Sequence, residues 1–142
     1  MIDRPLTKNI RPDGPLGLAA YERAGGYEAV RLALKTLTSQ EVTQRVKDAN
    51  LRGRGGAGFP TGVKWSLVPM GPDAPRPKYL VVNGDEMEPG TFKDRLLLEG
   101  DPHLLVEGVI LAAYAIQAEV AYVFLRGEYL VAQERVQRAI EE

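Results

Sequence analysis

The sequence of 142 residues contains no cysteine and a single histidine, His103. Without cysteine the chain can form neither a disulfide nor a thiolate-ligated zinc or iron–sulfur centre, and one histidine is a poor basis for a metal site. We therefore expect no metal site here. The formal charge of −1 excludes a generally basic protein that coats nucleic acid. The sequence thus predicts no nucleic-acid partner.

Long apolar runs are also missing. The longest, from Leu104 to Ala118, is interrupted by Glu107 and Gln117 and is too short to cross a bilayer. Residues 1–17 show neither the apolar core of a signal peptide nor the Arg- and Ser-rich pattern of a transit peptide. These absences favour a protein of the bacterial cytoplasm without membrane insertion. The prolines and glycines scattered through residues 1–17 predict an extended arm.

The rest of the chain alternates helical and strand patterns, which predicts an α/β fold. Apolar periodicity and cap residues predict helices over 18–24, 27–35, 39–49, 102–117 and from 130 onward, with strands over 79–83 and 122–125. The strand–loop–helix–strand order implies parallel strands with a right-handed crossover. Two parallel strands make an improbable complete sheet and the last helix has no stop signal, so we expect the amino-terminal part of a longer protein.

Several local features are specific enough to be tested. Thr38 and Glu41 form the pattern of a capping box at a helix start. Val30, Leu34 and Leu37 fall at helical spacing, which predicts that they form the buried side of the helix at 27–35. His103 is expected to be a capping or packing residue, and Glu107 a partly exposed helix residue.

The most distinctive stretch runs from Leu51 to Trp65, with five glycines among two arginines, a lysine and two aromatic residues. Glycine lets the backbone approach a ligand closely, and successive free amides form an anion-binding concavity. Residues 53–58 fit G-x-G-x-x-G, but a Rossmann fingerprint follows a strand and opens a long helix, whereas this one follows a predicted helix. The Walker pattern fails as well. The alternatives are a phosphate-binding loop of another kind and a flexible surface loop.

A second polar stretch follows the predicted strand at 79–83. Open α/β sheets bind their ligands at the carboxyl ends of strands. Asp85, Glu86 and Glu88 form an acidic cluster there, which is also compatible with a solvated turn. The three carboxylates have no EF-hand spacing, so a cation site is not favoured.

Taken together, four ordered motifs closely resemble the NADH-binding flavoprotein subunit of respiratory complex I, which in bacteria is the F subunit. These motifs span residues 52–65, 83–95, 102–108 and 126–129. The resemblance extends from about Tyr21 onward and is more specific than any lone glycine motif. It implies that residues 18–142 are the first part of a Rossmann-like FMN-binding domain. The second flavin segment and the cysteines that ligate an iron–sulfur cluster are then expected beyond Glu142.

The resemblance also implies which residues bind the two nucleotides. Those expected to line FMN through loop amides and positive charge are Gly53, Arg54, Gly55 and Lys64. Those expected to hydrogen-bond the flavin and its ribityl chain are Asn83 and Asp85, with Glu86 as a further candidate. Phe59 resembles the aromatic residue that stacks on the NADH adenine, and Glu88 the catalytic carboxylate near the nicotinamide. Some relatives place a second aromatic residue where this chain has Leu67.

The implied activity is transfer of a hydride from NADH to FMN, followed by single electrons to an iron–sulfur cluster and onward to quinone. The implied cofactors are FMN and NADH, with a 4Fe–4S cluster only in the missing carboxyl-terminal part. Other subunits of the complex, especially one that carries a 2Fe–2S cluster, are the implied partners, peripheral to the cytoplasmic side of the inner membrane. Two alternatives stay open: the diaphorase subunit of an NAD-linked hydrogenase or formate dehydrogenase, and a non-catalytic assembly module that kept the fold.

Overall fold

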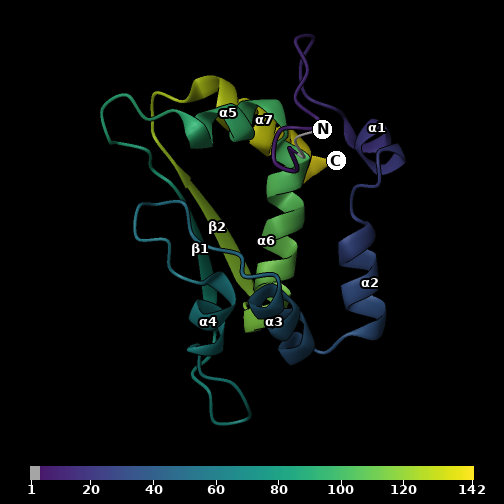
Figure 1. The fold of residues 1–142 in the computed structure, drawn as a ribbon, viewed down its shortest axis with the longest axis vertical. Coiled ribbons are helices and arrows are strands. Elements are labelled where there is room, and N and C mark those ends of the chain that lie inside the picture. Colours follow the sequence, from purple (N-terminus) through teal and green to yellow (C-terminus); the bar gives the residue numbers. More distant parts are fainter. Residues whose placement is uncertain (1–3) are drawn as a thin grey trace. The chain divides into compact units, whose positions relative to one another are not determined.

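The computed structural model describes residues 4–142. Helices and strands follow one another along the chain as Figure 1 shows: α1 (Leu18–Arg23), α2 (Glu28–Thr36), α3 (Ser39–Asp48), α4 (Thr61–Ser66), β1 (Tyr79–Gly84), α5 (Lys93–Gly100), α6 (Pro102–Ile116), β2 (Val120–Leu125) and α7 (Leu130–Glu141). The predicted α/β class and the predicted elements are confirmed, with boundaries that differ by at most two residues. The short helices α4 and α5 lie where the sequence predicted no regular structure.

The two strands are parallel, as predicted. They begin side by side, since the Glu119 amide donates to the Lys78 carbonyl over 2.9 Å. They also end side by side, because a Cβ built on Gly84 would lie 3.2 Å from the Phe124 carbonyl oxygen. Over the described residues the sheet has only these two strands.

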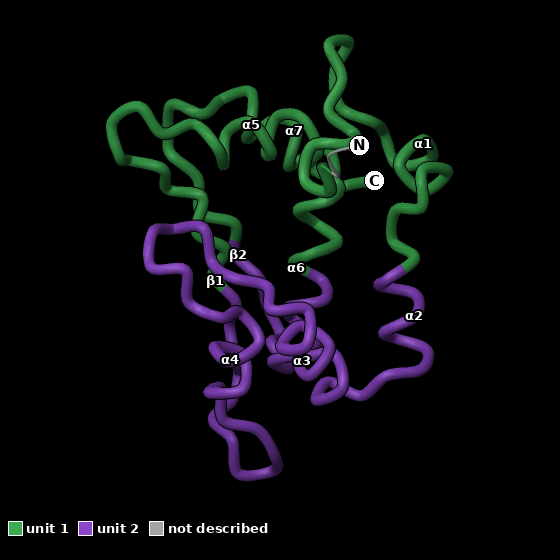
Figure 2. Tube along the Cα trace, viewed as in Figure 1, with its two compact units in different colours: residues 1–28, 81–109, 123–142 green, residues 29–80, 110–122 purple. Residues whose placement is uncertain are grey.

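The chain divides into two compact units, which Figure 2 shows in different colours. One unit, here called the carboxylate unit, comprises residues 1–28, 81–109 and 123–142; the other, the glycine-loop unit, comprises residues 29–80 and 110–122. The predicted boundary of a flavin domain at residue 18 stays a prediction.

The glycine-loop unit is built on small apolar residues. Its core contains Ala33, Val42 and Ala115, with Leu37, Trp65, Leu111 and Tyr114 packed against them. Here one prediction was wrong: Leu34 is 54% exposed, and its neighbour Ala33 is buried. The buried residues of α2 are therefore Val30 and Ala33. Leu37, just after the helix, is partly buried and packs against the same core as Ala33.

A capping box starts helix α3, and a glycine of α4 allows close packing against it. The Thr38 hydroxyl accepts a hydrogen bond from the Glu41 amide at 3.2 Å, and the Glu41 carboxylate accepts one from the Thr38 amide at 2.7 Å, which confirms the capping box. Gly62 of α4 is buried against α3, where an added Cβ would lie 2.6 Å from the Lys47 backbone nitrogen. Only glycine permits this approach of the two helices.

The carboxylate unit has its own core, of Leu98, Ala132 and Val136, around which α5 and α7 pack together. The Arg135 guanidinium donates to the Glu99 carbonyl over 2.6 Å and links the two helices further. Residues predicted as an extended arm form successive turns instead, from Arg4 to Gly14. The turns are anchored, since the Asn9 amide group donates to the buried Asp101 carboxylate over 2.9 Å.

A polar network with buried members lies in the same unit. The Tyr21 hydroxyl donates to the Glu107 carboxylate over 2.6 Å. His103 is 2% exposed and bonds the Tyr27 hydroxyl through Nδ1 and the Glu142 carboxylate through Nε2. The packing role of His103 is confirmed, but Glu107 is 9% exposed rather than partly exposed. Burial beside carboxylates raises the pKa of Tyr27 to about 12, so both phenols remain donors at neutral pH.

Candidate functional site

The glycine stretch forms a closed loop between two helices. Residues 52 and 60 pair as an antiparallel bridge. The Gly53 amide donates to the Phe59 carbonyl at 2.9 Å, and the Thr61 amide to the Leu51 carbonyl at 2.8 Å. Helix α3 precedes the loop, and the helix that follows, α4, has only six residues. The exclusion of a Rossmann fingerprint, which needs a strand before the loop and a long helix after it, is therefore confirmed.

Inside the loop the backbone is exposed and its amides are free. Of all the hydrogen bonds among residues 4–142, none has the amide of Arg54, Gly55, Gly56, Ala57 or Gly58 as its donor. Gly56 and Gly58 have φ angles of +111° and +61°, which a residue with a side chain adopts only with strain. Successive amides with such backbone angles are the geometry that binds anions.

Gly53 and Gly55 differ from these two. Neither has a positive φ angle. A Cβ added to Gly55 would meet nothing within 4 Å, and one added to Gly53 would meet only the Phe59 backbone, at ordinary contact distance. The fold of the described residues does not require glycine at either position, so the open space beside them is available to a ligand.

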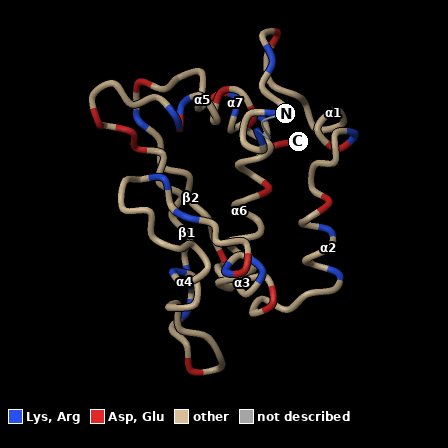
Figure 3. The backbone as a smooth tube through the Cα atoms, in the orientation of Figure 1, with Lys and Arg blue, Asp and Glu red and all other residues tan. Residues whose placement is uncertain are grey.

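The loop also presents side chains without partners inside the chain. Within the described part of the protein, Arg54 and Lys64 form no ion pair or side-chain hydrogen bond, whereas Arg52 donates to the Gly58 carbonyl over 3.4 Å. The Phe59 side chain is 48% exposed and Leu67 is 70% exposed. Figure 3 shows positive and negative residues interspersed along the chain rather than gathered in one basic stripe. The loop therefore offers a local cationic site.

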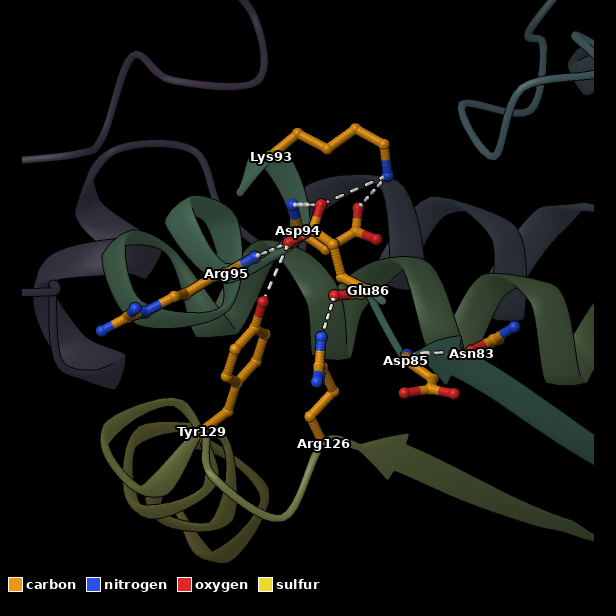
Figure 4. Close-up of polar contacts among 8 residues, drawn as sticks. All are labelled: Asn83, Asp85, Glu86, Lys93, Asp94, Arg95, Arg126 and Tyr129. Atoms are coloured by element: carbon orange, nitrogen blue, oxygen red, sulfur yellow. Dashed lines mark hydrogen bonds and ion pairs between the residues drawn. The ribbon is translucent and has the colours of Figure 1, made fainter. Parts of the chain in front are cut away.

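The second predicted segment lies in the carboxylate unit and continues the alternation of β1. Gly84 and Glu86 are buried, while Asn83 is exposed and Asp85 half-buried. The Asn83 side-chain oxygen accepts a hydrogen bond from the Asp85 amide at 2.9 Å, which leaves the Asn83 amide group and the Asp85 carboxylate free (Figure 4). Asn83 and Asp85 thus lie on one side of the segment and Glu86 on the other.

Glu86 is engaged inside the protein. Figure 4 shows it surrounded by residues from α5 and from the segment after β2. Burial raises the pKa of its carboxyl, but hydrogen bonds from the Asp94 and Arg95 amides and the charge of Lys93 outweigh burial and hold the pKa below the usual value. The carboxylate is therefore ionised at neutral pH and already has its partners.

Glu88 begins a tight turn. The Thr91 amide donates to the Glu88 carbonyl at 3.0 Å, with Pro89 second and Gly90 third at φ +82°. Proline followed by a glycine with positive φ is the pattern of a type II turn. The Glu88 side chain is exposed. It is free to reach a ligand, and the predicted contact of Glu88 with the nicotinamide stays a prediction.

The structure thus gathers the predicted residues into two groups, one within each unit. Gly53, Arg54, Gly55, Phe59 and Lys64 belong to the glycine-loop unit, and Asn83, Asp85, Glu86 and Glu88 to the carboxylate unit. Sequence reasoning missed Arg126 and Lys93, which contact Glu86. Both lie inside the noted motifs, at 83–95 and 126–129, but no sequence pattern signals their contact with Glu86. Over residues 4–142 there is no cluster of side chains that could bind a metal.

Comparison with known proteins identifies the family. Residues 46–142, which include both groups, match the model of the Nuo51 FMN-binding domain. The chain belongs to this family. A similar protein is the F 2 subunit of NADH-quinone oxidoreductase from Rhizobium meliloti (strain 1021), 56% identical over all of this chain and 33% of the relative. The F subunit of the same enzyme from Escherichia coli (strain K12) is 52% identical over 97% of this chain and 31% of the relative.

As a member of the Nuo51 family, the chain spans about a third of the length of these relatives. A solved structure of NAD+-reducing NiFe-hydrogenase in the air-oxidized state is also similar: it is 42% identical, has a TM-score of 0.63, and matches 79% of this chain and 22% of that chain. This likeness supports the α/β fold of the Nuo51 domain. No helix among residues 4–142 is long and apolar enough to cross a membrane.

Proposed function

We propose that this chain is the part of an NADH-oxidising flavoprotein subunit that binds FMN and NADH, in an NADH-quinone oxidoreductase of the same kind as its two relatives. The observation that carries the proposal is the glycine loop: free amides and two cations without partners, inside a match to an FMN-binding family. The finer assignments follow from the resemblance of the four sequence motifs to the flavoprotein subunit of complex I. They comprise a 24 kDa-type partner subunit with a 2Fe–2S cluster and a place on the cytoplasmic side of the membrane.

The residues of the loop fit FMN. The cofactor has a phosphate dianion and a flat ring system, and when bound it accepts a hydride from NADH and releases electrons singly. The loop amides and the Lys64 ammonium supply positive potential for the phosphate or the electron-rich flavin ring. Gly53 and Gly55 leave the backbone open to the ring, because no Cβ stands between them and the ligand. The exposed Phe59 ring offers a face on which the NADH adenine stacks.

The carboxylate unit supplies groups of the other kind. The free Asn83 amide donates and the Asp85 carboxylate accepts, a pair suited to flavin and ribityl hydroxyl groups. An exposed carboxylate such as that of Glu88 can stabilise the cationic nicotinamide ring of NAD+. We therefore assign Glu88 to the nicotinamide end of NADH, in contact with the reacting nucleotide.

Substitution of Lys64 and Glu88 in the full protein that carries this chain tests the proposal. Lys64→Ala should lower flavin content at least tenfold at limiting FMN, and Glu88→Gln should alter the KM for NADH in the ferricyanide assay while flavin is retained. Lys35→Ala, which removes an exposed lysine from α2, serves as the matched control. Wild-type flavin content and NADH oxidation in both variants would refute the assignment. A wild-type protein without FMN would instead favour the non-catalytic assembly module.

The similarity to NAD+-reducing NiFe-hydrogenase supports a second candidate function, that of the NADH-binding subunit of a soluble hydrogenase. The identity of 56% and 52% to the two quinone oxidoreductase subunits, against 42% to the hydrogenase chain, favours the first. Subunits that purify with the full protein distinguish the two. Nickel in the purified complex, with hydrogen-dependent NAD+ reduction, would establish the hydrogenase.

A further inference from the structure

The carboxylate of Glu86 closes the base of the loop that presents Glu88. Its Oε1 accepts a hydrogen bond from the Asp94 amide at 3.0 Å, and its Oε2 accepts one from the Arg95 amide at 3.2 Å. Those amides lie in the first turn of α5, whose own N-cap residue provides no side-chain hydrogen bond. Glu86 therefore caps a helix that starts seven residues downstream, and the chain between them is closed into a loop.

The same residue is fixed at its backbone. The Arg126 guanidinium, just after β2, donates to the Glu86 carbonyl over 2.7 Å. The Tyr129 hydroxyl lies 3.5 Å from Oε2, and the Arg95 and Arg126 guanidinium groups lie over the Tyr129 ring at 5.5 and 5.9 Å (Figure 4). The Lys93 ammonium adds an ion pair at 3.7 Å. With its side chain 2% exposed, Glu86 has no surface left for a cofactor.

The loop closed in this way carries the turn from Glu88 to Thr91. One side of the turn is tied down at residue 86, and the other at residues 94 and 95, both through one carboxylate. Loop residues that are fixed at both ends retain little freedom, so the position of the exposed Glu88 side chain depends on contacts that it does not itself make.

We propose that Glu86 is a positioning residue, which fixes the closed loop of residues 86–95 and thereby sets where the Glu88 carboxylate meets the nicotinamide nucleotide. This inference rests on the proposed function of Glu88. It replaces the expectation that Glu86 binds the cofactor itself. The competing interpretation is that Glu86 only stabilises the fold as a helix cap.

A double-mutant cycle in the full protein separates the two interpretations. Glu86→Gln keeps the size of the side chain but sets an NH2 group against an amide N–H, so one hydrogen bond at the base of the loop is lost. We expect kcat/KM for NADH per bound flavin to fall about tenfold in Glu86→Gln, and to fall less than twofold when the same change is made on a Glu88→Gln background. The two effects should not add, because Glu86 acts on NADH turnover through Glu88.

Glu41→Gln is the matched control, because Glu41 also caps a helix with an ionised carboxylate but lies in the other unit. It should lower thermal stability without changing kcat/KM. Equal effects of Glu86→Gln with and without Glu88, or wild-type kinetics in Glu86→Gln, would overturn the inference. Should Glu86→Gln not fold, Arg126→Gln, which frees the Glu86 carbonyl, goes through the same cycle. The proposed function fails separately, if the wild-type protein neither retains FMN nor oxidises NADH.

Discussion

Alanine substitutions at neighbouring glycines of the loop should have opposite consequences. Gly55 has an ordinary φ angle and open space where a Cβ would lie, so the folded state of Gly55→Ala is unstrained. Alanine also restricts the unfolded chain, which stabilises a protein by about 0.4–1 kcal/mol where the backbone is compatible. Gly56 has a φ of +111°, where a side chain costs about 1–3 kcal/mol.

Gly55→Ala should weaken the binding of FMN, although it does not destabilise the fold. If the flavin approaches the loop backbone, the added methyl group occupies its place, and the Kd of Gly55→Ala for FMN should rise at least tenfold, about 1.4 kcal/mol. Chemical unfolding of the apoprotein measures the stability of both variants, and quenching of FMN fluorescence measures the affinity. We expect Gly55→Ala to be stable and weak in binding.

Two results would refute this reasoning. An unchanged Kd in Gly55→Ala would mean that the ligand does not approach the backbone there. A loss of stability in Gly55→Ala equal to that in Gly56→Ala would mean that Gly55 serves the fold. Gly108→Ala is the control for a glycine outside the loop sequence, since its Cβ would also meet nothing within 4 Å.

Three further expectations concern the fold and the pH dependence. Gly62→Ala should destabilise the protein by about 1–3 kcal/mol, because the added methyl group overpacks α4 on α3. Gly108→Ala should stabilise it by about 0.5–1 kcal/mol, because alanine favours the helix more than glycine does. Thermal unfolding of the two variants measures the difference. Tyr21→Phe leaves the buried Glu107 carboxylate without its phenol donor and should cost about 1–3 kcal/mol in urea unfolding. Because the folded-state pKa of Glu86 is lowered, its contribution to stability is complete above the unfolded-state pKa of about 4.3 and is lost as the pH falls through the lower folded value. Urea midpoints of wild type and Glu86→Gln should therefore converge as the pH falls below the unfolded-state pKa, and a constant gap would contradict the assigned charge.

Much of the fold was predictable because its signals are local. The Thr38 box marks a helix start within a few residues of the amides that it serves. Gly25, with φ +91°, lies just after the end of α1, where the sequence predicted the stop. In each case the residues that decide the structure are neighbours in the sequence.

The missed elements depend on distant residues instead. Helix α4 contains Gly62, which disfavours a helix by propensity, but the same glycine allows close packing on α3. Distant residues also decide which of Ala33 and Leu34 is buried. Hydrophobicity favours burial of the leucine, but the space in the core of the glycine-loop unit suits the alanine. Periodicity within one helix cannot contain that information, because the neighbouring surface sets the size of the pocket.

The acidic cluster shows where sequence reasoning about the site ends. Asp85, Glu86 and Glu88 form one group in the sequence, and three carboxylates within four residues repel one another. The structure separates them: strand alternation turns Glu86 inward, where the α5 amides and the Lys93 ammonium stabilise its charge. The capping role of Glu86 could be recognised only if α5 were predicted. The sequence did not predict α5, because the N-cap residue of this helix makes no side-chain hydrogen bond and the cap comes from Glu86.

This separation also explains how the loop can present negative charge to a nucleotide without losing its shape. Were all three carboxylates exposed, their repulsion and flexibility would leave Glu88 without a defined position. With Glu86 buried and bound at both its carbonyl and its carboxylate, the repulsion is reduced and the turn at Glu88 starts two residues from a fixed point. The position of the exposed Glu88 carboxylate therefore depends on the buried Glu86 carboxylate. The double-mutant cycle measures this dependence, because removal of Glu86 should lower kcat/KM for NADH only while Glu88 is present.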